Sequence, residues 1–121
     1  MKDRIILLDG AVGTSLWKKA EALGIEKVPV WNYNITCPDI VKELTQEYLD
    51  AGSEIIMTNT FGANRPAVER SSGYTVSEVV RAGVRLAREV IGDKAKVSLD
   101  VGPLSAMLEP YGDMEIGRAH V

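Results

Sequence analysis

Cysteine is almost absent from this chain: one occurs among 121 residues, so no disulfide can form within it. A chain without internal disulfides is typical of a reducing compartment, and we expect a cytoplasmic protein. The 14 lysines and arginines are outnumbered by 17 acidic residues, which gives a net charge of −3. This balance leaves no broad basic surface, so we expect no nucleic-acid partner and no polybasic contact with a membrane.

Long hydrophobic runs are missing as well. No apolar stretch of the sequence approaches the ~18 residues that a membrane span needs. The apolar run Ile5–Leu8, close to the N-terminus, is too short for the core of a signal peptide. We therefore expect no membrane partner. A chain of 121 residues has room for one domain at most.

Three short apolar runs are present, and each ends in an acid or amide beside a glycine. The first closes on Asp9-Gly10, the second on Asn59-Thr60 with Gly62 nearby, and the third on Asp100-Val101-Gly102. This pattern is typical of a buried strand whose carboxyl end lies at a ligand-binding site. We therefore expect three strands whose ends share one rim of functional groups. The first run does not alternate with polar residues, which predicts a strand buried on both faces.

Helical patterns separate these runs. The helix expected at Thr75–Ile91 has the clearest signal, because Thr75 and Glu78 have the spacing of a capping box. Proline at the first helical position, Pro38, marks the start of another helix. The expected strands are Arg4–Asp9, Ser53–Thr60 and Lys96–Asp100; the expected helices are Gly13–Leu23, Pro38–Ala51, a short or irregular one in Gly62–Arg70 interrupted by Pro66, and Thr75–Ile91; Ile25–Thr36 is expected to be an ordered loop. Helices between strands predict an α/β fold with a parallel sheet.

Two parallel architectures compete. A doubly wound sheet would use Asp9–Gly13 as a phosphate-binding turn, but this segment lacks the G-x-G-x-x-G spacing. In a (β/α)8 barrel, ligand-binding groups come from the carboxyl ends of successive strands, which is the pattern seen here. Barrels typically need ~250 residues. The sequence therefore predicts the N-terminal portion, about three strands, of a (β/α)8 TIM barrel.

Three segments carry a family resemblance: LLDGAVGTSL (Leu7–Leu16), CPDIVKELTQEYLDAGSEIIMTNTFGAN (Cys37–Asn64) and DVGPLSAMLEPYGD (Asp100–Asp113). They resemble the homocysteine-binding domain of the homocysteine S-methyltransferase family, which includes the N-terminal module of cobalamin-dependent methionine synthase. The resemblance implies a (β/α)8 barrel that binds zinc through three cysteine thiolates. It also implies that the zinc-bound homocysteine sulfur attacks a methyl group on methylcobalamin, methylfolate, betaine or a sulfonium. A cobalamin domain or a corrinoid protein is then an expected partner.

The chain departs from the family pattern at the metal. The family's zinc cysteines lie on later strands, in an N-C motif and a G-G-C-C-G-T segment, and neither occurs here. Cys37 does not correspond to a ligand, and Met57 stands where many members have Glu. We therefore expect the zinc ligands in a missing C-terminal part. This chain alone should be inactive, with no catalytic or metal-binding residue of its own.

Carried over by position, the resemblance implies a set of substrate-binding residues: Asp9, Gly10, Ala11, Asn59, Thr60, Asp100 and Gly102. Asp9 would accept hydrogen bonds from the substrate ammonium, with the Gly10-Ala11 backbone alongside. Alternatively, Asp9 caps the following helix. Asn59 and Thr60 would line the pocket floor, unless they only satisfy backbone groups of a buried loop. Asp100 and Gly102 would shape the opposite wall, unless turn geometry alone requires them.

The last six residues, 116–121, read IGRAHV, and one codon choice for this peptide is the start of a widely used sequencing adapter. We therefore expect residues 1–115 to be a partial homocysteine-binding barrel domain and residues 116–121 to be a non-native tail. An open parallel sheet has unpaired edges, so we also expect poor solubility or self-association. The alternative is a short non-catalytic module that binds an amino acid or is completed by a partner.

Overall fold

The computed structural model describes residues 5–71 and 73–102, and the residues of the suspected tail lie outside this part, as does the 115/116 boundary. The described elements, in chain order, are α1 (Gly13–Ala22), the 3-10 helix η1 (Val30–Asn32), α2 (Tyr33–Thr36), α3 (Pro38–Asp50), β1 (Ile55–Met57), α4 (Arg65–Ser71), α5 (Val76–Ile91) and β2 (Lys96–Ser98). Helices precede β1 and separate it from β2, in agreement with the predicted α/β arrangement. No helix in the described ranges has the length and apolar character to cross a membrane.

The sheet is parallel and its segments lie in chain order. β1 pairs with β2 in the register Ile55↔Lys96 to Met57↔Ser98. On the other side of β1, Leu8 forms a parallel bridge to Ile55, and the Glu54 amide donates to the Leu7 carbonyl at 2.7 Å. The three predicted strands are therefore neighbours, but β1 and β2 are shorter than predicted, and the described part of the first forms an isolated bridge in place of a regular strand.

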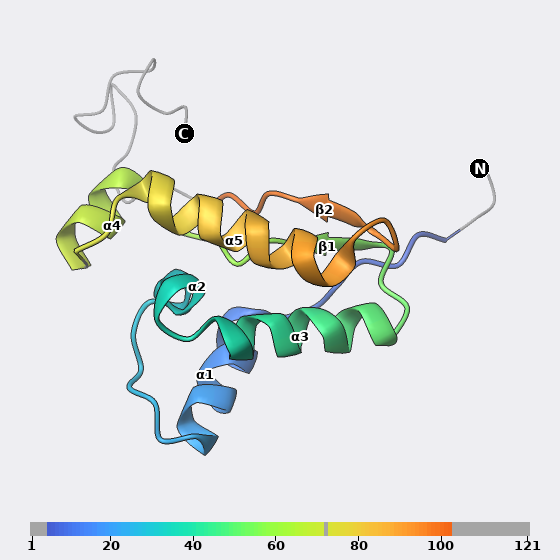
Figure 1. The fold of residues 1–121 in the computed structure, drawn as a ribbon, viewed down its shortest axis with the longest axis horizontal. Coiled ribbons are helices and arrows are strands. Elements are labelled where there is room, and N and C mark those ends of the chain that lie inside the picture. Colours follow the sequence, from blue (N-terminus) through green and yellow to red (C-terminus); the bar gives the residue numbers. More distant parts are fainter. Residues whose placement is uncertain (1–4, 72, 103–121) are drawn as a thin grey trace, which may run out of the picture.

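The two long helices pack against each other beside the sheet. Figure 1 shows α3 and α5 running side by side, with α5 next to β1 and β2. Thr75 and Glu78 form the predicted capping box of α5, since the side chain of each residue accepts a hydrogen bond from the backbone N–H of the other. Pro38 is at the start of α3, with Asp39 in the first turn. The predictions of both helices are confirmed.

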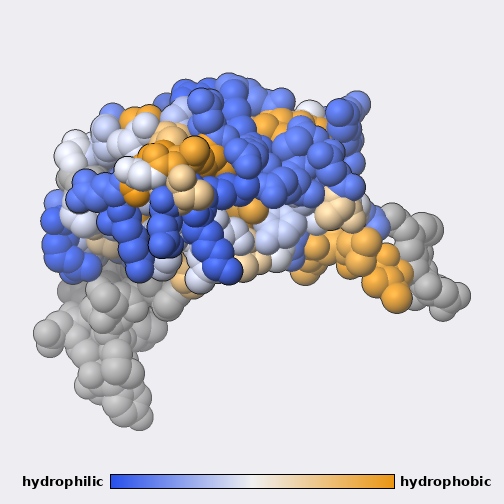
Figure 2. Space-filling model, turned by 90° about the horizontal axis from the view of Figure 1, so that it is seen from below, coloured by the Kyte–Doolittle hydropathy of each residue, from blue (hydrophilic) through white to orange (hydrophobic). Residues whose placement is uncertain are grey.

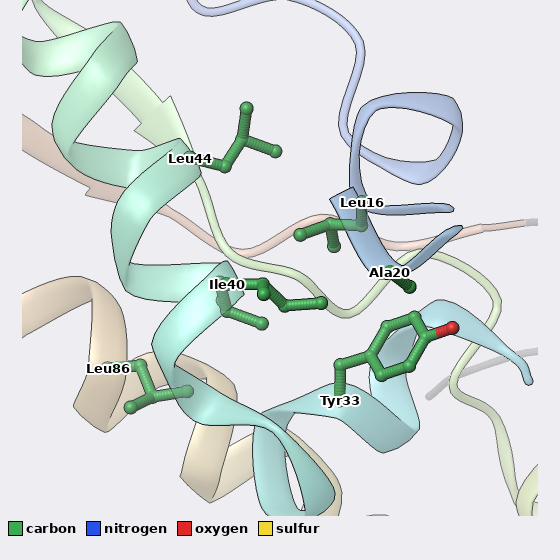
Figure 3. Close-up of a cluster of buried hydrophobic side chains, with 7 residues drawn as sticks. Leu16, Ala20, Tyr33, Ile40, Leu44 and Leu86 are labelled. Carbon is green, nitrogen blue, oxygen red and sulfur yellow. The ribbon is translucent and has the colours of Figure 1, made fainter. Parts of the chain in front are cut away.

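One hydrophobic cluster ties the helices together. Figure 3 shows Leu16 and Ala20 of α1, Tyr33 of α2, Ile40 and Leu44 of α3 and Leu86 of α5 converging on one centre. A smaller cluster holds Ile56, Ala87 and Ile91, so that α5 covers one face of β1.

Three predictions about local structure are wrong. Ile25–Thr36 is not all loop, because η1 and α2 form there and bury Trp31 and Tyr33. A short helix does form near the expected Gly62–Arg70, as Arg65–Ser71, but Pro66 does not interrupt it, because Pro66 lies in the first turn, where a missing N–H costs no helical hydrogen bond. The first run is not buried on both faces.

That first run supplies four of the eight large hydrophobic residues that are exposed in the described ranges. Ile5 is 82% exposed, and Ile6, Leu7 and Leu8 are 50–56% exposed. Figure 2 shows this hydrophobic surface at the end of the molecule where the described chain begins. In the part of the chain that the structure describes, the backbone of the run pairs with Glu54 and Ile55 on one side.

Candidate functional site

The carboxyl ends of the three parallel segments meet, and hydrogen bonds join them. The Met57 backbone N–H, at the end of β1, donates to Asp9 Oδ2 at 2.9 Å. The Thr60 hydroxyl donates to the Asp100 carbonyl at 2.6 Å. Asp9, Thr60 and Asp100 therefore belong to one rim, although 91 positions of sequence separate the first from the last. We refer to Asp9, Met57–Thr60 and Asp100 as the strand-end rim.

Two carboxyl groups lie on this rim, and the charge of Asp9 acts on Asp100. Burial raises the pKa of the Asp100 carboxyl above its usual value, and the negative charge of Asp9 raises it further. A cation between two such carboxylates is stabilised by both and relieves their repulsion. Asp9 does not cap α1, because the N-cap is Val12 and no side chain caps that helix. The two carboxyl groups therefore make this part of the rim locally acidic.

Gly10 and Ala11 continue the rim as exposed backbone that a tyrosine holds in place. The Tyr48 hydroxyl of α3 donates to the Ala11 carbonyl at 2.5 Å. A Cβ on Gly10 would lie 2.9 Å from the same hydroxyl oxygen, so any larger residue there would require the Tyr48 ring to shift. Tyr48 was not among the predicted site residues, because its position in the sequence is that of the apolar stripe of α3.

Within the rim, the Asn59 side chain forms a buried amide pair with Asn34. Its side-chain Nδ2 donates to the Val30 carbonyl at 2.7 Å and to Asn34 Oδ1 at 3.0 Å. Asn34 in turn donates from Nδ2 to the Asn59 carbonyl at 2.8 Å. Asn59 Oδ1 is buried without a hydrogen-bond partner in the structure. Asn34 is a further residue that the sequence did not indicate, since its segment reads as a loop.

Five of the seven predicted site residues line one or the other of two cavities, and Gly10 and Ala11 line neither. Asp9 and Asn59 line a cavity of about 10 Å³, which has room for about one water molecule. Thr60, Asp100 and Gly102 line a larger one of about 430 Å³ beside α5, together with Gly62, Ala63, Asn64, Arg65, Val76, Ser77, Val80, Arg81, Leu99 and Val101. A Cβ on Gly102 would lie 2.6 Å from the Gly62 amide nitrogen, so close backbone packing requires this glycine.

The described residues do not fit a zinc site. In residues 5–71 and 73–102, no three His, Cys, Asp or Glu side chains are placed to hold a metal ion. Cys37, the single cysteine of the chain, is half-buried at the N-cap of α3 and caps no backbone group with its side chain. A site of three thiolates cannot be made from one cysteine.

Comparisons with known proteins agree on one family. The family model described as homocysteine S-methyltransferase matches residues 6–120. Homocysteine S-methyltransferase 1 of Zea mays is 35% identical over 89 residues, which are 69% of this chain and 26% of that protein. Methionine synthase of Mycobacterium leprae is 30% identical over 98 residues, or 74% of this chain and 8% of that protein.

A solved structure shares the fold. The metallated form of the homocysteine methyltransferase MmuM from Escherichia coli superposes with a TM-score of 0.63 at 23% identity. The match covers 84% of this chain and 39% of that one. The chain therefore spans about a quarter of the maize relative and well under half of the bacterial structure.

Proposed function

Because the chain belongs to the homocysteine S-methyltransferase family, we propose that it is the N-terminal part of an enzyme that methylates the homocysteine thiolate to give methionine. The three parallel segments would be the first three strands of a (β/α)8 barrel. We place the enzyme in the cytoplasm, the setting that the near-absence of cysteine favours. The full-length protein is the product of the complete reading frame that contains this chain.

The observation that supports this proposal is the pair of carboxylates at the strand-end rim. Homocysteine carries an ammonium group, and Asp9 and Asp100 would hold it between them. The burial and the Asp9 charge that raise the pKa of Asp100 both oppose its ionisation, and a bound ammonium would reverse that effect. The Gly10-Ala11 backbone, held by Tyr48, would lie against the amino-acid end of the substrate.

Zinc belongs to the proposal only through parts outside this chain. Bound zinc keeps a thiol ionised at neutral pH, whereas a free thiol with a pKa of ~8.5 is mostly protonated. Since the residues present do not fit the ion, we expect its cysteine ligands on later strands of the full-length protein and assign no step to it here. This chain alone would then be inactive. Methylcobalamin, on a following cobalamin domain or a separate corrinoid protein, is one candidate methyl donor.

The experiment begins with the gene. Sequencing source DNA through and beyond the codon for Glu115 should show a frame that continues without IGRAHV and encodes an N-C motif and a G-G-C-C-G segment. The full-length protein, purified with zinc, is then assayed for methionine from homocysteine with methylcobalamin, methylfolate, betaine or a methylsulfonium as donor. We expect one donor to support turnover. A gene that stops after Val121, or a zinc-loaded protein inactive with every donor, would overturn the proposal.

A further inference from the structure

Two buried threonines close a ring of hydrogen bonds around the backbone of Asp100. The Asp100 N–H donates to Thr58 Oγ1 at 3.3 Å, and Thr60 Oγ1 donates to the Asp100 carbonyl at 2.6 Å. The two hydroxyl oxygens are 2.8 Å apart. A hydroxyl has one proton to donate, and that of Thr60 goes to the carbonyl, which can only accept. Thr58 must therefore donate to Thr60, and the ring runs in one direction.

Burial makes this ring hard to replace. Thr58 is 1% exposed and Thr60 is 3% exposed, so water has little access to either hydroxyl. The Thr58 amide also donates to the Ser98 carbonyl at 2.8 Å, which fixes this segment against the end of β2. Hydrogen bonds in such surroundings are strong, and an unpaired member is costly. Both polar backbone groups of Asp100 are thereby fixed, and with them the point from which its carboxylate projects.

The same segment also holds the second carboxylate. The Met57 N–H, one residue before the ring, donates to Asp9 Oδ2 at 2.9 Å. Four consecutive residues, Met57–Thr60, therefore contact both Asp9 and Asp100. This segment therefore links the two acids through its hydrogen bonds to each of them.

We propose that Thr58 and Thr60 are positioning residues: their hydroxyl pair places the Asp100 carboxylate opposite Asp9 and so determines the affinity for the substrate ammonium. This inference rests on the proposed function, since it assumes that the ammonium is bound at this rim. It assigns Thr60 a role through Asp100 in place of direct contact with the substrate. The hydroxyls, not the threonine methyl groups, carry the effect.

The test compares variants of the full-length protein that differ by a hydroxyl. The variants Thr60→Val and Thr58→Val keep the side-chain shape but remove a hydroxyl, which breaks the ring of hydrogen bonds. The variants Thr60→Ser and Thr58→Ser keep the hydroxyl and therefore the ring. Thr45→Val is the matched control, because Thr45 is also buried but donates only to the Val41 carbonyl within α3, at 2.9 Å. The KM for homocysteine and kcat are measured at saturating methyl donor.

We expect both valine variants to raise the homocysteine KM by about tenfold or more, the equivalent of losing one charge-assisted contact. Their kcat should change much less, both serine variants should be close to wild type, and Thr45→Val should leave both constants unchanged. In an Asp100→Asn background, Thr60→Val should add no further increase. An unchanged KM in the valine variants, or a serine variant as impaired as its valine counterpart, would overturn the proposal.

Hydrogen exchange on the wild-type protein tests the ring without any variant. The Asp100 amide lies beyond the last residue of β2, yet it should exchange as slowly as the amides of the strand. Fast exchange would contradict the ring even if the variants fail to fold. If the wild-type enzyme makes no methionine, the proposed function fails, and the exchange rate still decides whether the ring exists.

Discussion

Replacing Gly83, in the middle of α5, by alanine should have two opposite effects on the free energy of unfolding. In an exposed helix, replacing glycine by alanine stabilises by about 1 kcal/mol, because glycine loses more backbone freedom on folding. Gly83 is buried, however. A Cβ there would lie 2.8 Å from Asn34 Nδ2 and 3.0 Å from Thr60 Cγ2. Asn34 must move, or the helix must shift away from it.

The cost of that movement follows from what Asn34 holds. Its Nδ2 donates to the Asn59 carbonyl at 2.8 Å and to the Val79 carbonyl at 3.2 Å. Overpacking a close-fitting site costs about 1–3 kcal/mol, and each displaced hydrogen bond costs about 1 kcal/mol more. If one of the two hydrogen bonds is displaced, its cost cancels the gain in helix propensity of about 1 kcal/mol, so we expect Gly83→Ala to destabilise the fold by about 1–3 kcal/mol.

The measurement is urea or thermal unfolding of the full-length protein, followed by a signal from this domain. Gly73→Ala is the matched control, because a Cβ at Gly73 would meet nothing within 4 Å. The control should be neutral or slightly stabilising. If Gly83→Ala raises the stability by about 1 kcal/mol, as in an exposed helix, the close packing of α5 on Asn34 is refuted.

Two further predictions concern charge and exposed surface. At neutral pH Asp100→Asn should raise the melting temperature, because burial and the Asp9 charge raise the pKa of Asp100 in the folded state above its usual 3.8. The stabilising effect of protonated Asp100 on the wild-type protein is fully present below the unfolded pKa and is lost as the pH rises through the folded pKa. The difference in melting temperature between Asp100→Asn and wild type should therefore shrink as the pH falls toward 3.8. A difference that stays constant with pH would refute this explanation. The 121-residue chain expressed alone should self-associate through the exposed run of residues 5–8, which light scattering would detect; a monomer that melts cooperatively would contradict this.

The parts of the fold that were predictable from sequence are those with local signals. α3 and α5 begin where Pro38 and the Thr75–Glu78 capping box place them, since these signals act within one helical turn. The shared rim was predictable as well, because the carboxyl ends of neighbouring parallel strands meet at one edge of a sheet.

What the sequence did not reveal depends on contacts between distant residues. Tyr33 turns a segment that reads as a loop into a short helix by packing with Leu16 and Ile40 of two other helices. The partners of the rim are similarly distant: Tyr48 reaches Ala11 across 37 positions, and Asn34 reaches Asn59 across 25. No local pattern encodes such pairs, so only the folded chain shows them.

Binding of the substrate ammonium at the strand-end rim is the central claim, and Asp9→Asn tests it most directly. The measurement is the KM for homocysteine of the full-length enzyme, with Asp93→Asn, at an exposed position, as the matched control. Loss of a charged hydrogen-bond partner costs about 1.5–3 kcal/mol, so the KM should rise roughly tenfold to a hundredfold while the control stays at the wild-type value. An Asp9→Asn enzyme with the wild-type KM would show that homocysteine is not held by this rim.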